Sequence, residues 1–307
     1  MAASPKIIVI LGPTASGKSA LAVALAEKIG GEILSVDSMQ VYRGMDIGTA
    51  KPTAHDRRRI VHHLLDIADP NETFSVSKFV ELADQIIADA ARRNIPLIAT
   101  GGTPLYYKSL FEGLFEGPSA DASLRLRLSA EPLESLHQKL QQIDPAAATR
   151  IHLNDRRRLI RAIEVFELTG QTISSLQTEW TSGKTRHDAI WIGLQWDRDA
   201  INRRINARVK QMIEQGWLDE TRNLLARYHE LSKTAAEATG YRELIDHLHG
   251  KMSLDDAIEQ IKIATRQLAR RQMKWFRQFK DVNWLKGDAS PESLLTDAVR
   301  LSLAVSR

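Results

Sequence analysis

The sequence predicts an α/β fold in which a parallel sheet is covered by helices on both faces, with an all-helical subdomain inserted into it. Over the first hundred residues, short apolar segments alternate with helical segments, as expected for parallel strands joined by crossover helices. A glycine-rich turn follows the first apolar segment. From about residue 120 to residue 188 the pattern is helical only, and an apolar segment then returns.

The individual elements follow from the spacing of the apolar residues. Strands are expected at residues 6–11, 32–36, 62–67, 95–100 and 189–196. Helices are expected at residues 18–29, 77–93, 198–228 and 254–279. Gly216 is expected to interrupt the third of these helices.

A break in the pattern separates two parts of the chain. Gly117, Pro118 and Ser119 form a turn-rich stretch before the helical block. Because an apolar strand returns after the block, we expect an insertion rather than a second domain in tandem. The expected core comprises residues 5–121 and 189–307, and the expected insertion comprises residues 122–188.

The composition is that of a soluble globular protein. The 307 residues are 43% hydrophobic and 26% charged. Cysteine is absent, which excludes disulfides, thiolate zinc sites and a cysteine nucleophile. The first residues lack the pattern of a signal peptide, and the first apolar segment is too short to cross a membrane. We therefore expect a cytoplasmic monomer without a membrane partner.

Residues 12–19 form a phosphate-binding motif. They are Gly12, Pro13, Thr14, Ala15, Ser16, Gly17, Lys18 and Ser19, which match G-x-x-x-x-G-K-[ST] between an expected strand and an expected helix. The glycines let backbone N–H groups turn toward phosphate oxygens, Lys18 adds a positive charge, and Ser19 offers a hydroxyl to Mg²⁺. The motif predicts a P-loop NTPase-like core. It leaves open whether ATP, GTP or a diphosphate ester binds there.

A carboxylate is expected beside this loop. Asp37 follows the second expected strand, and ligands of such sheets bind at the carboxyl ends of strands. Asp37 is a candidate for binding Mg²⁺, for orienting a sugar hydroxyl or for acting as a general base, and a turn or helix cap is the structural alternative. Thr103, after the fourth expected strand, is either a helix cap or a donor to a phosphate oxygen. No expected strand ends in the acidic signature of a hydrolytic P-loop protein, which argues against a motor or a GTPase.

Basic residues cluster at 156–161, 203–210 and 266–277, within a net charge of +4. Arginines at the start of the helix near residue 156 oppose the helix dipole, which favours an anionic partner over a solvated face. The last segment predicts a helix with two faces. Its basic face comprises Arg266, Arg270, Lys274 and Arg277. Its apolar face, expected in the core, comprises Leu268, Trp275 and Phe279.

Taken together, these residues resemble the tRNA dimethylallyltransferases, which are also called isopentenyl-diphosphate:tRNA transferases. The matching stretches follow the family's order over nearly the whole chain. They are residues 12–19, Ser-Val-Asp-Ser-Met-Gln at 35–40, Met-Asp-Ile-Gly-Thr-Ala-Lys-Pro at 45–52, Gly-Gly-Thr-Pro-Leu-Tyr at 101–106, the Asn-Asp and arginine pattern at 154–165, Gly-Tyr-Arg-Glu at 240–243 and Arg-Gln-x-x-Trp-Phe-Arg at 271–277.

The resemblance implies transfer of a dimethylallyl group from dimethylallyl diphosphate to N6 of the adenosine 3′-adjacent to the tRNA anticodon, with Mg²⁺ as cofactor. It implies that Asp37 is the general base and that Thr103 lines the same channel. The diphosphate would be held by Thr14, Gly17, Lys18, Ser19 and Arg125. The insertion would clamp the anticodon stem-loop. The segments that match the family's tRNA contacts contain Asp37, Ser38, Met39, Gln40, Arg157, Arg158, Leu159, Ile160, Arg161, Gly240, Tyr241, Arg242, Arg270, Arg271, Lys274, Trp275 and Arg277.

Two departures and three alternatives accompany the resemblance. Arg157 stands where the family commonly has Gln, and the absence of cysteine rules out the zinc finger of eukaryotic members, which indicates the bacterial form. The nearest alternative is an adenylate isopentenyltransferase that acts on free AMP. A P-loop kinase and a non-catalytic RNA-binding ATPase are the others. The arginine clusters and the insertion favour tRNA over AMP.

Overall fold

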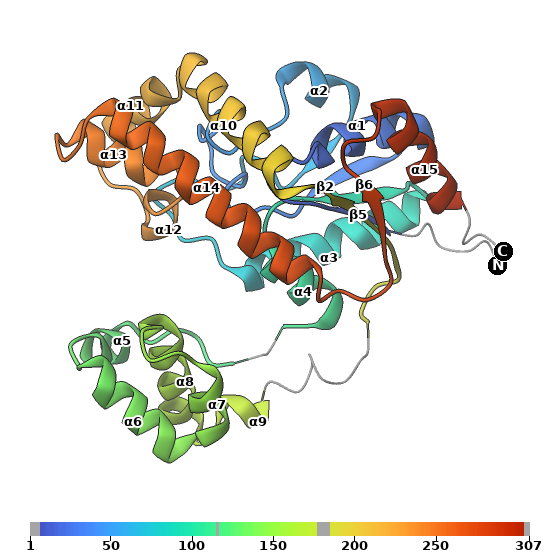
Figure 1. Cartoon of the computed structure of the whole chain (residues 1–307). Coiled ribbons are helices and arrows are strands. Elements are labelled where there is room, and N and C mark those ends of the chain that lie inside the picture. Colours follow the sequence, from blue (N-terminus) through green and yellow to red (C-terminus); the bar gives the residue numbers. More distant parts are fainter. Residues whose placement is uncertain (1–6, 115–116, 177–184, 304–307) are drawn as a thin grey trace. The chain divides into compact units, whose positions relative to one another are not determined.

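The computed structural model describes residues 7–114, 117–176 and 185–303, and the chain divides into two compact units (Figure 1). The larger unit combines residues 1–110 with residues 187–307. The smaller unit comprises residues 111–186. The predicted fold class is confirmed, because the larger unit is built on a parallel sheet and the smaller unit contains helices. Within the described ranges, no helix is both long enough and apolar enough to span a membrane.

Six parallel strands form the sheet of the larger unit. They are β1 (Ile7–Leu11), β2 (Glu32–Ser35), β3 (His62–His63), β4 (Leu97–Thr100), β5 (Ala189–Gln195) and β6 (Val282–Lys286). Their order across the sheet is β3-β2-β4-β1-β5-β6, and every neighbouring pair is parallel. The carboxyl ends of the central strands β1, β2 and β4 therefore lie at one edge of the sheet.

The helices of the larger unit cover both faces of this sheet and one end of it. They are α1 (Lys18–Ile29), α2 (Ala54–Arg59), α3 (Val76–Arg93), α4 (Pro104–Glu112), α10 (Arg198–Glu214), α11 (Trp217–Tyr228), α12 (Lys233–Ala236), α13 (Tyr241–Leu248), α14 (Leu254–Phe276) and α15 (Pro291–Leu303). Figure 1 shows α1 and α15 on one face and α3 and α4 on the other. Ile10 of β1 lies in one apolar cluster with Leu25 of α1 and Ala298 of α15.

The observed elements differ from the expected ones at a few places. The expected strand at residues 62–67 is reduced to His62–His63, because Leu64 and Asp66 have φ angles of +62° and +56°, which an extended strand does not allow. β6 and α15 were not expected. Gly216 breaks the long helix as predicted, with a φ of +96°.

The buried face of α14 also differs from the expected one. Leu268, Trp275 and Phe279 were expected in the core, but each is only half buried. The residues of α14 that are buried are Ala257, Ile261, Ala269, Gln272 and Phe276. Their spacing follows the 3.6-residue repeat with small residues included, which a pattern read from the large apolar residues alone misses.

The smaller unit is a set of short helices around its own apolar core. They are α5 (Ala122–Ser129), α6 (Leu133–Ile143), α7 (Pro145–Arg150), α8 (Arg156–Thr169) and α9 (Ile173–Leu176). Leu128, Leu140 and Leu159 are fully buried in this core. Glu164 of α8 is also fully buried, and its carboxylate is paired with Arg125 of α5 at 2.8 Å. Part of the expected insertion, residues 177–184, lies outside the described residues.

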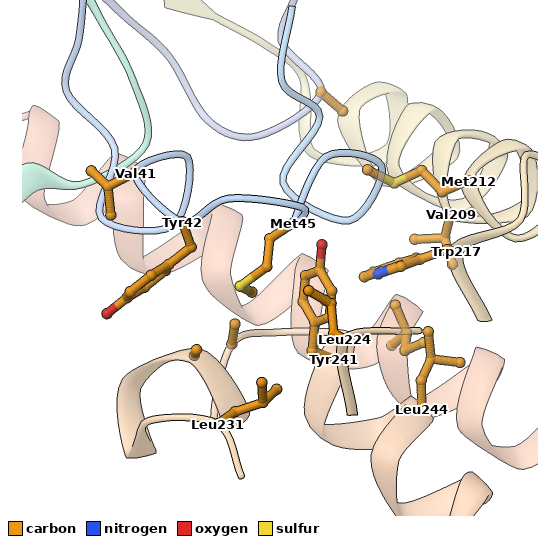
Figure 2. Packing of buried hydrophobic residues seen from close by; sticks show 14 of the residues in the cluster. Val41, Tyr42, Met45, Val209, Met212, Trp217, Leu224, Leu231, Tyr241 and Leu244 are labelled. Carbon is orange, nitrogen blue, oxygen red and sulfur yellow. The ribbon is translucent and has the colours of Figure 1, made fainter. Parts of the chain in front are cut away.

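A second apolar core of the larger unit fixes the loop that follows β2. Figure 2 shows Tyr42 and Met45 of this loop among side chains of the C-terminal helices. Trp217 of α11 and Tyr241 of α13 meet edge to face, with ring centroids 5.6 Å apart. A Cβ on Gly48 would lie 2.1 Å from Nε1 of Trp217, so this position admits no side chain. The part of the loop around these residues is therefore fixed by side-chain packing.

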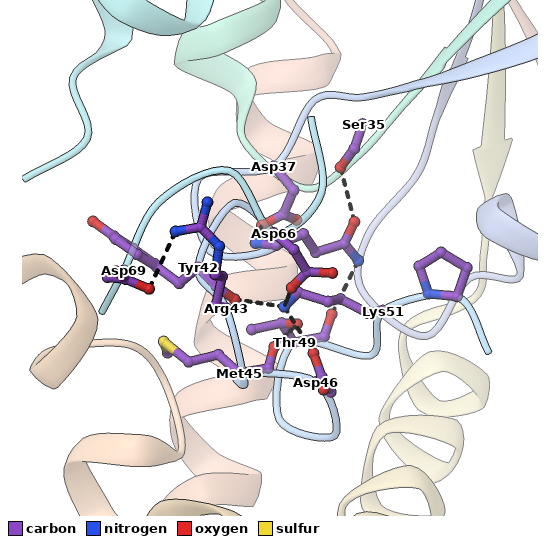
Figure 3. Close-up of polar contacts among 12 residues, drawn as sticks. Ser35, Asp37, Tyr42, Arg43, Met45, Asp46, Thr49, Lys51, Asp66 and Asp69 are labelled. Carbon is purple, nitrogen blue, oxygen red and sulfur yellow. Dashed lines mark hydrogen bonds and ion pairs between the residues drawn. The ribbon is translucent and has the colours of Figure 1, made fainter. Parts of the chain in front are cut away.

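Two polar side chains hold the backbone of the same loop. Lys51, whose side chain is 1% exposed, pairs with Asp46 at 2.8 Å and with Asp66 at 2.6 Å, and it donates to the carbonyl of Tyr42 (Figure 3). The carboxylate of Glu220 in α11 accepts the N–H groups of residues 46, 47 and 48 and the hydroxyl of Tyr241. Side chains thus provide partners for backbone groups that have none within the loop.

We predict that Lys51→Met destabilises the fold by about 2 kcal/mol, because it leaves the Tyr42 carbonyl and two carboxylates without their shared donor. Urea unfolding followed by circular dichroism measures the change. Lys210→Met is the matched control, since Lys210 is exposed and its ion pair with Glu214 is 3.8 Å long. We expect this control to stay within about 0.5 kcal/mol of the parent. Equal stability of the two variants would contradict the role of Lys51.

Candidate active site

The loop between β1 and α1 has the geometry of an anion cradle. Ala15 and Gly17 have φ angles of +65° and +92°, which turn the chain sharply before α1 begins at Lys18. The N–H of Ser16 donates to the carbonyl of Pro13 at 3.1 Å, and Lys18 Nζ donates to the same carbonyl at 3.3 Å. The first N–H groups of a helix have no acceptor within it. The start of α1 therefore offers donors and a partial positive charge to an anion.

Two side chains from later in the chain, one just after β5 and one in α10, hold the outer surface of this loop. Arg204 of α10 donates from Nε to the carbonyl of Ala15 at 2.9 Å. Trp196, just after β5, donates from Nε1 to the carbonyl of Ser16 at 3.1 Å. The Arg204 guanidinium also lies 4.5 Å from the centre of the Trp196 ring. Because C=O and N–H point in opposite directions in a trans peptide, these bonds direct the N–H of Gly17 away from Trp196.

Positive charge converges on the loop. Lys18 is 8% exposed, and burial together with the neighbouring Arg208 lowers its pKa from the ordinary 10.5 to about 8, against the opposing effect of Asp37. Burial lowers the pKa of Arg208 as well; Asp37 opposes that shift and the charge of Arg204 adds to it. Three cations at one loop, with one carboxylate beside them, are the electrostatic environment of a bound polyanion.

Asp37 lies in the neighbouring loop, immediately beyond β2. Its Oδ1 accepts the N–H groups of Met39 at 2.9 Å and of Gln40 at 3.4 Å. Its Oδ2 accepts the N–H of Gly102, after β4, at 3.1 Å. These bonds fix the orientation of the carboxylate. Asp37 is therefore held in place by loops from two strands.

The loop after β4 is fitted against the end of β2. A Cβ on Gly101 would lie 2.0 Å from the carbonyl oxygen of Val36, so only glycine permits this approach. Thr103 Oγ1 accepts the N–H of Ser38 at 2.9 Å and donates to the Ser38 hydroxyl at 3.1 Å. Thr103 therefore joins the loops after β2 and β4.

A pocket opens beside the P-loop. Thr14 and Ala15 line it at one side, together with Arg208. Its other walls are mostly apolar and come from the loop after β2, from α10, α11 and α14, and from the segment before α13. They are Gly48, Thr49, Ile205, Val209, Met212, Trp217, Thr239, Thr265 and Leu268. The cradle is therefore continuous with a space suited to an uncharged group.

Most of the predicted phosphate-site residues are brought together in the larger unit. The P-loop, Asp37 and Thr103 all lie at the carboxyl ends of β1, β2 and β4. Ser19 lies exposed in the first turn of α1. Arg125 belongs instead to the smaller unit, where its Nε and Nη2 bind Glu164. Its predicted role at the diphosphate stays a prediction.

Some of the residues predicted to contact tRNA have exposed side chains and others are buried. Those with exposed side chains are Arg157, Arg158, Arg242, Arg270, Arg271, Lys274 and Arg277. Leu159 and Ile160 are buried in the core of the smaller unit, and Tyr241 is 1% exposed. These three side chains pack the helices that carry exposed arginines, and the assignment of their segments to RNA contact stays a prediction. Gly240 is buried too, with a φ of +93° and Trp217 packed against it.

Gln40 and Arg161, which are also among the predicted contacts, have hydrogen-bond partners inside the protein. Gln40 accepts from Ser35 and donates to the carbonyls of Thr49 and Ala50, so it ties the end of β2 to the following loop (Figure 3). Arg161 binds Glu164 and the carbonyl of Pro118. Ser38, Met39 and Trp275 are half buried.

The arginines at the start of α8 have partners that offset their unfavourable interaction with the helix dipole. Asp155 caps the helix by accepting the N–H of Arg158, and its carboxylate lies 3.4 Å from the Arg158 guanidinium. Arg156 donates to the carbonyls of Ser129 and Glu131. The cost of cations at this helix start is therefore offset within the unit. Their exposure, more than their position, indicates an anionic partner.

Four residues of the site were not predicted from the sequence: Trp196, Arg204, Arg208 and Gln272. Arg204 and Arg208 lie in the basic segment 203–210 and are four residues apart, so they share one face of a helix. That spacing could have predicted that both guanidinium groups face the same site. Gln272 is a lone polar residue on the buried face of α14, between Ala269 and Phe276. Such a residue has a buried polar partner as a rule, although the sequence does not say which.

Comparison with known proteins identifies the family. The family model described as IPP transferase matches residues 40–279, and the model described as isopentenyl transferase matches residues 5–66. A tRNA dimethylallyltransferase of Geobacter metallireducens is 45% identical over 295 residues, which cover 95% of this chain and 96% of that protein. The chain belongs to the tRNA dimethylallyltransferase family.

Solved structures agree with this membership. The tRNA isopentenylpyrophosphate transferase of Bacillus halodurans is similar with a TM-score of 0.73 and 39% identity, over 98% of this chain and 96% of that one. A eukaryotic dimethylallyltransferase acting on tRNA gives a TM-score of 0.82 and 30% identity, over 99% of this chain and 79% of that one. The predicted family is confirmed, and the chain is a transferase of the bacterial type.

The lowered pKa of Lys18 makes anion binding dependent on pH. An anion favours the protonated amine, so the site should take up a proton when pyrophosphate binds near pH 8, and its affinity should fall as the pH rises above 8. Calorimetry in buffers of different ionisation enthalpy measures this uptake. Lys18→Arg is the control, because its side chain stays protonated and its data report the protons taken up by pyrophosphate alone. The same uptake in both proteins at pH 8 would contradict the assignment.

Proposed function

We propose that this enzyme transfers the dimethylallyl group of dimethylallyl diphosphate to N6 of the adenosine 3′-adjacent to a tRNA anticodon. The observation that supports the donor best is the junction between the phosphate cradle and the mostly apolar pocket beside it. A prenyl diphosphate has this division of one charged end and one apolar end. Family membership supports the same donor and a tRNA acceptor.

The diphosphate is held by donors of this chain. Main-chain N–H groups at the start of α1, the amine of Lys18 and the guanidinium of Arg208 surround its position. Mg²⁺ fits at the Ser19 hydroxyl, because it is commonly bound through substrate phosphates and water, and the described residues contain no group of three or more acidic, histidine or cysteine side chains that would hold it alone. When bound, Mg²⁺ neutralises charge on the departing diphosphate.

The transfer is a substitution at C1 of the dimethylallyl group. The amine nitrogen N6 forms a bond to C1, and the bond from C1 to the diphosphate oxygen breaks with its electron pair on the oxygen. One proton of the amine passes to the carboxylate of Asp37, which its three N–H donors orient toward the site. An adenine amine is a weak nucleophile, so removing its proton in the transition state favours attack. The cradle stabilises the negative charge that develops on the leaving group.

Exposed cations supply the RNA surface. In the larger unit, α14 carries Arg270, Arg271 and Lys274, and Arg277 follows its last residue; all four are exposed. In the smaller unit, Arg157 and Arg158 are exposed at the start of α8. Contacts of this kind bind the phosphate backbone, and their energy offsets the few kcal/mol needed to extrude a base from its stack. We propose that α8 and the rest of the smaller unit clamp the anticodon arm.

Arg125 is proposed to bind the same diphosphate. Its guanidinium already binds Glu164 through Nε and Nη2, so a phosphate contact would use the N–H groups of Nη1 and the second N–H of Nη2. The location in the cytoplasm and the monomeric state stay predictions.

One assay separates the proposal from its alternatives. The purified enzyme is incubated with labelled dimethylallyl diphosphate and Mg²⁺, together with either unmodified tRNA or AMP. We expect label on tRNA alone. Label on AMP alone would show an adenylate isopentenyltransferase, and phosphate transfer from ATP without prenyl transfer would show a kinase.

Asp37→Asn tests the general base. The variant keeps the size of the side chain and one acceptor for the loop, but it cannot take up the proton. We expect kcat to fall by roughly 10²- to 10⁴-fold, with tRNA affinity changed little. Single-turnover prenylation and a filter-binding assay measure the two quantities. Comparable losses in both would make Asp37 a binding residue instead.

A further inference from the structure

The side chain of Gln272 connects two loops of the site from the buried face of α14. The residue is 3% exposed. Its Oε1 accepts the N–H of Thr14 in the P-loop at 2.8 Å. Its Nε2 donates to the carbonyl of Gly102, in the loop after β4, at 2.7 Å. One amide group of the C-terminal helix α14 therefore bridges Thr14 and Gly102, which are 88 residues apart in the sequence.

The orientation of this amide follows from its partners. An N–H can bond only to the amide oxygen, and a carbonyl can bond only to the amide nitrogen, so the two contacts together leave one orientation. Each contact is short and lies in the interior, where an unmade hydrogen bond costs roughly 1–3 kcal/mol. The bridge is therefore stiff.

The bridge ends next to the proposed base. Gly102 donates its N–H to Asp37 Oδ2 at 3.1 Å while its carbonyl accepts from Gln272. A Cβ on Gly102 would lie 2.9 Å from Gln272 Nε2 and 3.0 Å from Asp37 Oδ2. Both side chains therefore flank the same residue, with no room for a side chain between them. A shift of Gln272 would move Gly102, and with it one of the three donors to Asp37.

We propose that Gln272 is a positioning residue for the transfer, which sets the separation between the P-loop and Asp37. This inference rests on the proposed function, in which the P-loop holds the leaving group and Asp37 receives the proton. Attack at C1 requires the amine, C1 and the leaving oxygen to be aligned, and a displacement of about 1 Å in such a site costs about 100-fold in rate. Neither substrate needs to touch Gln272 for this effect.

Gln272→Glu removes one half of the bridge. A carboxylate still accepts the N–H of Thr14, but it has no hydrogen to donate to the carbonyl of Gly102. We expect the single-turnover rate of prenyl transfer to fall by roughly 10- to 100-fold. We expect the affinities for tRNA and for pyrophosphate to stay within about threefold, because the exposed cations of α14 and the amides of the cradle are unchanged.

Two further variants complete the test. Gln267→Glu adds the same charge to the exposed side of α14 and should keep the parent rate. Gln272→Met removes both bonds without adding a charge, and it should lose at least as much rate as Gln272→Glu. Thermal unfolding identifies any variant that has not folded. If Gln272→Met alone fails to fold, the Glu variant carries the test.

The outcomes distinguish the two proposals. No prenylation of tRNA by the parent enzyme would overturn the proposed function. If the parent enzyme prenylates tRNA and Gln272→Glu does so at the same rate, the positioning role alone is overturned. A loss of pyrophosphate or tRNA affinity as large as the loss of rate would overturn it too, because Gln272 would then act in binding. A lowered rate with near-parent affinities would support it.

Discussion

Parallel pairing of β1, β2 and β4 is the constraint on which the site depends. Because these strands run the same way, the P-loop, the loop with Asp37 and the loop with Gly102 begin at one edge of the sheet. The phosphate cradle and Asp37, the proposed base, are thereby brought to one edge of the sheet. The pairing does not by itself fix the loops, which are also held by side chains from other segments.

Polar side chains from the C-terminal helices supply those partners. Glu220 holds the loop after β2, Gln272 joins two loops, and Arg204 binds the outer carbonyl of the P-loop. Each comes from a segment more than 150 residues away from the loop that it holds. The second half of the chain thus contributes to the site mainly as its support. The exposed face of α14 adds the proposed RNA surface to the same element.

The sequence predicts the parts of the site that are local in the chain. The P-loop, the position of Asp37 and the break at Gly216 depend on spacing within a few residues, and they were found. The partners of Gln272 and Trp196 depend on contacts across more than 150 residues, which no local pattern shows. The burial of Leu159 and Ile160 could not be predicted either, because a motif matched by order says nothing about which of its side chains are buried.

The crowding of Lys18, Arg204 and Arg208 has a consequence for the end of the catalytic cycle. In the proposed transfer, the diphosphate gains one negative charge when the bond to C1 breaks, so we expect the same cations to hold the product more firmly than the ester. The interactions that would stabilise the leaving diphosphate in the transition state would also slow its dissociation from the site. Release of diphosphate, rather than formation of the new bond, is then the step that we expect to limit turnover.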